Sequence, residues 1–119
     1  MSKSILVVDD TRSMRAMVAS VLQGAGYEVE EAGDGVEALE RVRDRSPGLV
    51  ILDLFMPGMD GAEFRRRQLA DPQIAPIPVV VVSAAASLEE RVAEMRTAGH
   101  LEKPIRLEDL LALVERFCG

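Results

Sequence analysis

Three short, continuous apolar runs restrict the fold of this chain more than any other feature. They are ILVV at 5–8, LVIL at 49–52 and VVVV at 79–82. An apolar run without alternating polar residues is typical of a strand covered on both faces, as in a parallel sheet between two layers of helices. The runs predict strands over 4–8, 48–53 and 79–83. The more polar segments 27–32, expected at a sheet edge, and 100–102 bring the predicted strands to five.

Apolar residues at helical spacing follow each predicted strand. Gly24 and Gly99 end two of the helices, Asp34 caps another that runs to Arg43, and one more covers residues 60–70. The apolar positions are Met14, Met17, Val18, Val21 and Leu22; Val36, Leu39 and Val42, which should face inward; Phe64 and Leu69; Leu88, Val92 and Met95; and Leu107, Leu110, Leu111, Val114 and Phe117. We interpret the three arginines at 65–67 as a solvated helix face in preference to a docking patch.

Strict alternation of five strands and five helices predicts a parallel α/β sheet with helices on both faces. We expect the doubly wound, flavodoxin-like (βα)5 arrangement with strand order 2-1-3-4-5. The 119 residues contain no evident linker or repeat, so they are expected to form one domain, residues 1–119, with no output domain.

Composition excludes several classes of function. A net charge of −6 argues against binding of nucleic acid by the bare chain. No apolar stretch approaches the roughly 20 residues of a membrane span, and no signal peptide is evident, so no membrane association is expected. The single cysteine, Cys118, cannot form an intramolecular disulfide, which fits a cytoplasmic protein.

Polar residues stand at the end of four predicted strands. Asp9 and Asp10 follow the first strand, Asp53 ends the third, Ser83 ends the fourth, and Lys103 follows the fifth. In an open parallel sheet, ligands bind outside the carboxyl ends of the strands, where the strand order reverses. Because strands one and three are neighbours in the predicted order, three carboxylates should converge there, with a hydroxyl and an ammonium beside them.

The charges of these residues restrict what the predicted crevice can bind. Two carboxylates about 4 Å apart repel by about 4 kcal/mol at an effective dielectric constant of 20, so either one protonates or a cation binds. A hard, all-oxygen, partly hydrated site suits Mg²⁺, whereas zinc would want histidine or cysteine ligands. Lys103 and Ser83 are not needed for the metal and are suited to phosphoryl oxygens.

Three motifs resemble a known family. VVDD at 7–10, LVILDLFMPGMDG at 49–61 and LEKP at 101–104 closely resemble the receiver domain of two-component response regulators, of the single-domain chemotaxis type. The resemblance covers the whole chain, and the combination of motifs is far more specific than any one of them. It implies a phosphorylation-activated switch that catalyses only its own phosphotransfer and dephosphorylation.

The resemblance also implies a role for each acidic residue. Asp53 would be the phosphoacceptor, taking the phosphoryl group from a phosphohistidine. Asp10, Asp53 and the backbone carbonyl of Phe55 would hold Mg²⁺, or Mn²⁺ in its place, and Asp9 would act through a bound water. Such positioning and charge neutralisation is what phosphoryl transfer requires.

The remaining motif residues would bind the phosphoryl group or shape the loops. By resemblance, Lys103 would pair with a phosphoryl oxygen, and Ser83 would hydrogen-bond the group together with the backbone N–H of Ala84. Pro57, Gly58 and Gly61 would shape the loop after the phosphoacceptor. The family further suggests a cis bond between Lys103 and Pro104.

Two features depart from the family pattern. His100 takes the place of the aromatic residue that switches rotamer on phosphorylation, so it is either a switch residue, like Ser83, or merely a partly exposed strand residue. The loop before it is about three residues short. Phe55 and Ala85, two residues beyond Asp53 and Ser83, should alter the lifetime of the acyl phosphate in a direction that the sequence leaves open.

The predicted partners are proteins. A histidine kinase or a histidine phosphotransfer protein would supply the phosphoryl group. A downstream effector would dock on the face formed by the fourth predicted helix, the fifth strand and the last helix. Two rival functions stay open: a phosphohydrolase of the haloacid-dehalogenase type, which would want an acid in place of Phe55, and an interaction module that works without phosphorylation. The chain could also be a receiver cut from a larger protein.

Overall fold

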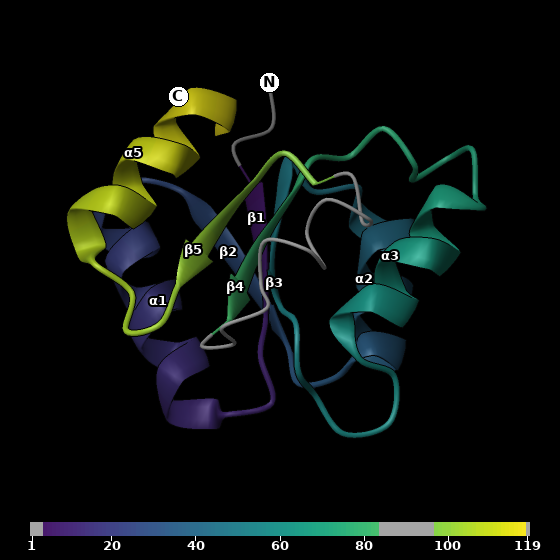
Figure 1. Ribbon diagram of the computed structural model, residues 1–119. Helices are drawn as coiled ribbons and strands as arrows, with labels where there is room; N and C mark the ends of the chain where they lie inside the picture. The colour runs from purple at the N-terminus through teal and green to yellow at the C-terminus, as the bar shows by residue number, and fades with distance from the viewer. Residues whose placement is uncertain (1–3, 84–96, 119) are drawn as a thin grey trace.

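The three apolar runs form the centre of a five-stranded parallel sheet in the computed structural model, which describes residues 4–83 and 97–118 (Figure 1). The strands are β1 (Ser4–Val8), β2 (Glu28–Ala32), β3 (Leu49–Asp53), β4 (Val79–Ser83) and β5 (Gly99–Glu102). Their order is β2-β1-β3-β4-β5, and every pair is parallel. The predicted fold, the strand order and the edge position of β2 are confirmed, and the predicted strand ends differ by at most one residue.

Four helices lie in the described part of the chain: α1 (Arg12–Gly24), α2 (Gly35–Arg45), α3 (Gly61–Leu69) and α5 (Leu107–Cys118). α1 and α5 cover one face of the sheet, and α2 and α3 cover the other (Figure 1). The helix predicted around Leu88, Val92 and Met95 lies outside the described residues. Across residues 4–83 and 97–118, each helix is too short or too polar to cross a bilayer.

The sheet divides the core into two apolar clusters because successive residues of each strand point to opposite faces. Leu6, Val8, Val50 and Leu52 belong to the cluster under α2 and α3, and Phe64 of α3 is fully buried in it. The cluster under α1 and α5 contains these residues: Ile5, Val7, Val18, Leu22, Leu49, Ile51, Val80, Val82, Leu110 and Val114. The uninterrupted apolar runs are therefore explained by burial on both faces.

Several apolar residues predicted on the helix stripes are exposed. Val36, which was expected to face inward, is 55% exposed in the first turn of α2, so that prediction is wrong. Met17, Leu69, Leu107 and Phe117 are also exposed. The buried residues of α2 are Gly35, Ala38, Leu39 and Val42, so Val36 lies about one residue's rotation to the side of the buried face. The apolar stripe is therefore wider than the buried face.

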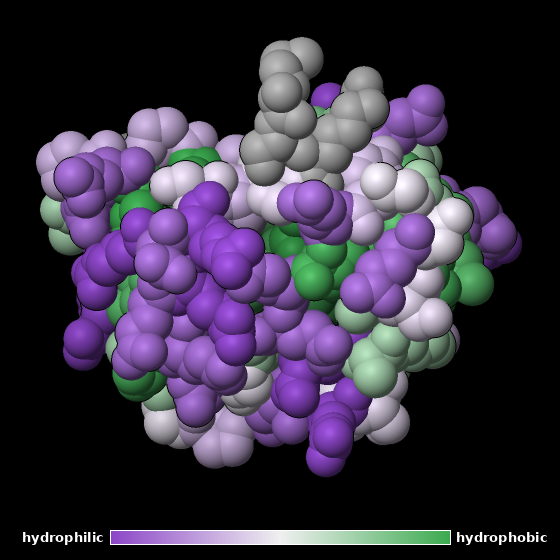
Figure 2. Space-filling model, turned by 180° about the vertical axis from the view of Figure 1, so that it is seen from behind, coloured by the Kyte–Doolittle hydropathy of each residue, from purple (hydrophilic) through white to green (hydrophobic). Residues whose placement is uncertain are grey.

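Charged side chains dominate the outer surface of α2 and α3. Arg41 pairs with Glu30 and Glu37, each at 3.2 Å, and Glu63 pairs with both Arg66 and Arg67. Figure 2, seen from behind, shows hydrophilic residues gathered over the side of the molecule where α2 lies. Opposite charges interspersed in this way keep the helix surface soluble, although each exposed pair contributes little stability.

The first residue of the arginine run, Arg65, is buried, which contradicts the solvated-face interpretation at that position. The guanidinium of Arg65 donates to Oε1 of Gln68 at 2.8 Å. The Gln68 amide in turn donates to the backbone carbonyls of Ile74 and Ile77, each at 2.9 Å. This network anchors the segment between α3 and β4, so the predicted solvated face holds for Arg66 and Arg67 but not for Arg65.

Replacing Gln68 by alanine should destabilise the domain by about 2 kcal/mol, because the carbonyls of Ile74 and Ile77 and the Arg65 guanidinium each lose their hydrogen bond to the Gln68 amide. Urea unfolding followed by far-UV circular dichroism measures the change. Arg67→Ala, an exposed position one residue earlier on the same helix, is the matched control and should change the unfolding free energy by less than about 0.5 kcal/mol. Equal effects of the two substitutions would contradict the anchoring role of Gln68.

Candidate functional site

The carboxyl ends of the parallel strands bring the predicted polar residues to one edge of the sheet. Asp53 is the last residue of β3, and Asp9 and Asp10 directly follow its neighbour β1. On the other side of β3, Ser83 is the last residue of β4, and Lys103 directly follows β5. The site therefore lies at the β1–β3 switch point, where the strand order reverses.

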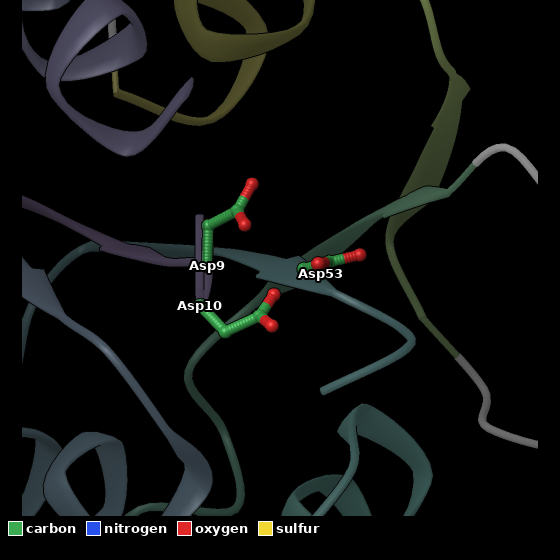
Figure 3. Close-up of side chains that lie close together, drawn as sticks. All are labelled: Asp9, Asp10 and Asp53. Carbon is green, nitrogen blue, oxygen red and sulfur yellow. The ribbon is translucent and has the colours of Figure 1, made fainter. Parts of the chain in front are cut away.

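Asp9, Asp10 and Asp53 form one cluster (Figure 3). Each offers a carboxylate oxygen, and these three oxygens lie within 4.8 Å of one another. The carboxyl groups of Asp9 and Asp53 are buried, whereas Asp10 is exposed. A site with one open side and only oxygen donors fits a small, hard, partly hydrated cation such as Mg²⁺.

Lys103 is the cation that contacts the two buried carboxylates. Its Nζ lies 3.6 Å from Oδ2 of Asp9 and 3.6 Å from Oδ2 of Asp53. When all three acids are ionised, the cluster with Lys103 carries three negative charges and one positive charge, a net charge of −2. A divalent cation would neutralise this charge, whereas a monovalent cation would leave a net charge of −1.

Burial raises the pKa of the Asp53 carboxyl from its ordinary value of 3.8 to about 6. The ammonium of Lys103 opposes this rise in pKa, and the negative charge of Asp9 adds to it. The backbone N–H of Phe55, which donates a long hydrogen bond of 3.4 Å to Oδ1 of Asp53, lowers the pKa, and Asp10 raises it. Without a bound cation, Asp53 is therefore only partly ionised near pH 6.

Backbone contacts hold the acid-bearing turns in place. The N–H of Thr11 donates to Oδ1 of Asp9 at 2.9 Å, which orients that carboxylate at the start of α1. After β3, the N–H of Gly61 donates to the carbonyl of Leu54 at 2.9 Å. A Cβ at Gly61 would lie 2.7 Å from the Asp53 carbonyl oxygen and 2.9 Å from the Leu54 Cα. Only glycine permits the start of α3 to approach the backbone of Asp53 so closely.

The other predicted site residues lie as follows. Ser83 is buried, and its carbonyl accepts a 3.0 Å hydrogen bond from the N–H of Lys103, which joins the ends of β4 and β5. Phe55 is exposed beside Asp53. His100 is exposed on the edge strand β5, opposite Val81 in the register. Ala84 and Ala85 lie outside the described residues, and the Lys103–Pro104 bond is cis, as predicted.

Arg15 of α1 is a residue next to the site that the sequence did not reveal. Its guanidinium donates to the backbone carbonyl of Asp9 at 2.7 Å and pairs with Glu31 of β2 at 3.0 Å. An arginine in the second turn of a helix is ordinarily a surface residue, so its type and spacing carry no signal. The contact of Arg15 with Glu31 becomes evident only in the structure, where α1 lies close to the edge strand β2.

Fold and site together define a class of protein. A doubly wound sheet carries an acid triad, a lysine and a buried serine at its switch point, and the acid triad could hold a metal ion. The family model described as response regulator receiver domain matches residues 5–115. The chain belongs to this family, the receiver domains of two-component signalling.

Known relatives agree with this assignment. The response regulator MprA of Mycobacterium ulcerans (strain Agy99) is 43% identical over 116 residues, which are 94% of this chain and 48% of the relative. MprA of Mycobacterium tuberculosis (strain CDC 1551 / Oshkosh) is 42% identical over 116 residues, 94% of this chain and 49% of the relative. This chain thus spans about half the length of the curated relatives it matches.

Solved structures show the same fold. The chemotaxis protein CheY4 of Vibrio cholerae superimposes with a TM-score of 0.89 at 34% identity, covering 98% of this chain and 99% of that chain. The signal receiver domain of a response regulator from Bermanella marisrubri gives a TM-score of 0.90 at 29% identity, with all of both chains covered. The predicted family and fold are both confirmed.

The raised pKa of Asp53 predicts how stability depends on pH in the absence of divalent metal. Because the folded-state pKa of about 6 exceeds the unfolded value, the stabilising contribution of Asp53 is complete below about pH 4 and is lost as the pH rises through 6. The free energy of unfolding of Asp53→Asn, minus that of the wild type, should therefore grow between pH 4 and pH 7, by up to about 3 kcal/mol.

Urea unfolding in EDTA across this pH range measures the difference. Asp44→Asn, on the exposed surface of α2, is the control for removal of one carboxylate. A difference between Asp53→Asn and the wild type that stays constant from pH 4 to pH 7 would contradict the burial of an ionisable Asp53.

Replacing Gly61 by alanine should move the loop after Asp53, since the new Cβ would meet backbone atoms that cannot rotate away. We expect a loss of about 1–3 kcal/mol of stability and a weaker Mg²⁺ interaction. Gly24→Ala is the matched control because a Cβ there has no neighbour within 4 Å and Gly24 ends α1. Thermal unfolding with and without Mg²⁺ gives both quantities, and equal behaviour of the two variants would refute the steric argument.

Proposed function

We propose that this chain is a phosphorylation-activated signalling switch that accepts a phosphoryl group on Asp53, with Mg²⁺ as cofactor. The observation that carries the proposal is the convergence of three carboxylate oxygens within 4.8 Å, with Lys103 3.6 Å from both buried acids. Membership of the receiver domain family supports the same role. A bound divalent cation would neutralise charge on the transferring phosphoryl oxygens.

The proposal gives each acidic residue of the site a separate role. Asp53 supplies the attacking carboxylate oxygen, and Asp10 and Asp53, with the Phe55 carbonyl, are the proposed cation ligands. Asp9 assists through water. The negative charge on Asp53 that attack requires is opposed by burial, so the neighbouring ammonium of Lys103 and a bound cation both favour the reactive, ionised form.

Lys103 and Ser83 are the proposed partners of the phosphoryl group. Lys103 already lies against the Asp53 carboxylate, so the ammonium would meet a phosphoryl oxygen without a large movement. Ser83 stands at the end of the adjacent strand, and its carbonyl is hydrogen-bonded to the Lys103 N–H. The Ala84 N–H is proposed to join them. His100 is proposed as the switch residue, acting from the neighbouring strand β5.

The proposed partners follow from this chemistry. A histidine kinase or a histidine phosphotransfer protein is the proposed donor. An effector protein is proposed to receive the signal by docking on β5, α5 and the fourth predicted helix, which lies outside the described residues. The free thiol of Cys118 suits work in the reducing cytoplasm. A phosphohydrolase of the haloacid-dehalogenase type is disfavoured because the residue two positions beyond Asp53 is Phe55, which cannot transfer a proton.

Incubation with acetyl phosphate and Mg²⁺ should add the mass of one phosphoryl group, and Asp53→Asn should abolish the addition. Intact-mass spectrometry measures it, and peptide mapping after borohydride reduction locates it. Asp60→Asn is a matched control, since Asp60 is an aspartate of the same loop that caps α3, and it should still be modified. Modification of Asp53→Asn at the wild-type stoichiometry would overturn the assignment, and steady hydrolysis of a phosphate ester would favour the enzyme instead.

A further inference from the structure

A single guanidinium, that of Arg15, joins the turn that carries the acid pair to the edge strand of the sheet. Its NH1 donates to the backbone carbonyl oxygen of Asp9 at 2.7 Å, and its Nε donates to Oε1 of Glu31 at 3.0 Å. The Arg15 side chain is only 17% exposed. Both contacts are charge-assisted, and the planar guanidinium group makes them in fixed relative directions.

Arg15 is also held from the side of the turn between β2 and α2. A Cβ at Gly33 would lie 3.3 Å from NH1 of Arg15, so the guanidinium packs against the backbone of this turn. The N–H of Gly33 is itself fixed by Oε1 of Glu37 at 2.8 Å. The arginine therefore has little freedom to release the Asp9 carbonyl without moving a second, independently anchored turn.

The carbonyl that Arg15 holds belongs to the peptide bond between Asp9 and Asp10. Because a peptide unit is planar, fixing its carbonyl oxygen also fixes the plane that contains the Cα atoms of both residues. The Thr11 N–H independently fixes the Asp9 carboxylate at 2.9 Å. Within the described residues, the exposed Asp10 carboxylate makes no side-chain hydrogen bond, so the direction of this side chain depends on the backbone.

We propose that Arg15 is a positioning residue for the cation site: it touches neither the cation nor the phosphoacceptor, and it acts by holding the Asp9–Asp10 peptide so that both carboxylates converge with Asp53. The inference rests on the proposed function, because it assumes that the acid cluster binds Mg²⁺. Glu31 is the residue that holds Arg15 in place from β2.

The sign of the effect separates positioning from simple electrostatics. Arg15 carries a positive charge close to the acid cluster, so its charge alone opposes the binding of a cation. If charge were its only influence, removing it would make Mg²⁺ bind more tightly. If positioning dominates, removing it makes Mg²⁺ bind more weakly, against the electrostatic trend.

Calorimetric titration with Mg²⁺ distinguishes the two. Arg15→Met keeps an unbranched apolar stem but removes the guanidinium and its donors, and it should weaken Mg²⁺ binding about tenfold, as loss of a supporting partner does at other metal sites. Arg15→Lys keeps the charge but cannot make both contacts, and it should also weaken binding, by a smaller factor. Arg41→Met is the matched control, because Arg41 likewise pairs with a glutamate of β2 but contacts none of the three acids.

Three further measurements test whether a loss of Mg²⁺ affinity comes from the lost position of the Asp9–Asp10 peptide: urea unfolding, a double variant, and phosphorylation at saturating Mg²⁺. Urea unfolding confirms that each variant is folded, and Arg15→Lys decides the question if Arg15→Met does not fold. If Glu31 acts only through Arg15, Glu31→Gln combined with Arg15→Met should bind Mg²⁺ no more weakly than Arg15→Met alone. At saturating Mg²⁺, phosphorylation of Arg15→Met by acetyl phosphate should return to near the wild-type rate.

Unchanged or tighter Mg²⁺ binding by folded Arg15→Met or Arg15→Lys would overturn the positioning role and leave the proposed function intact. Failure of the wild type to bind Mg²⁺ would instead overturn the proposed function. A loss of Mg²⁺ affinity in Arg41→Met as large as in Arg15→Met would also refute the proposal, since the effect would then not depend on the Asp9 carbonyl.

Discussion

The mutual repulsion of three carboxylates at the end of β1 and β3 is the constraint on which the rest of this structure depends. Asp9 and Asp53 are buried, and Lys103 neutralises only one of the three charges. Such a cluster loosens a fold unless the surrounding backbone holds it in place, and this domain holds it with strands that are buried on both faces. A divalent cation bound among the three carboxylates would relieve this repulsion and so stabilise the fold.

The scaffold separates the two tasks of packing and chemistry along each strand. The apolar runs 5–8, 49–52 and 79–82 of β1, β3 and β4 face one of two apolar clusters, and polar residues follow each run at the carboxyl end of the strand. Because the register pairs Leu52 with Val8 and Asp53 with Val82, the acids lie next to one another at the ends of the apolar runs of β1 and β3. The same parallel register places Ser83 and Lys103 together.

The apolar runs and the polar strand ends explain why so much could be predicted from the sequence. A short apolar run such as 79–82 is typical of a strand whose two faces are both covered by helices. The strand order then brings Asp9, Asp10 and Asp53 together. The inward face of α2 was harder to predict, because the exposure of Val36 depends on how the helix is rotated about its axis against the sheet. Arg65 was assigned to the surface because the burial of an arginine depends on a partner, Gln68, that spacing alone does not reveal.

Arg15 shows the same limit at the site itself. The residues that carry the chemistry follow strands and stand out by type, whereas a residue that holds their backbone is recognisable only by its contacts. Arg15 and Glu31 are 16 positions apart, and neither belongs to a motif. Their contact joins the acid-bearing turn to β2, just as the Lys103 N–H joins the ends of β5 and β4. The acid cluster is thus supported from both sides of the sheet: Arg15 links it to β2, and Lys103, which follows β5, contacts it from the other side.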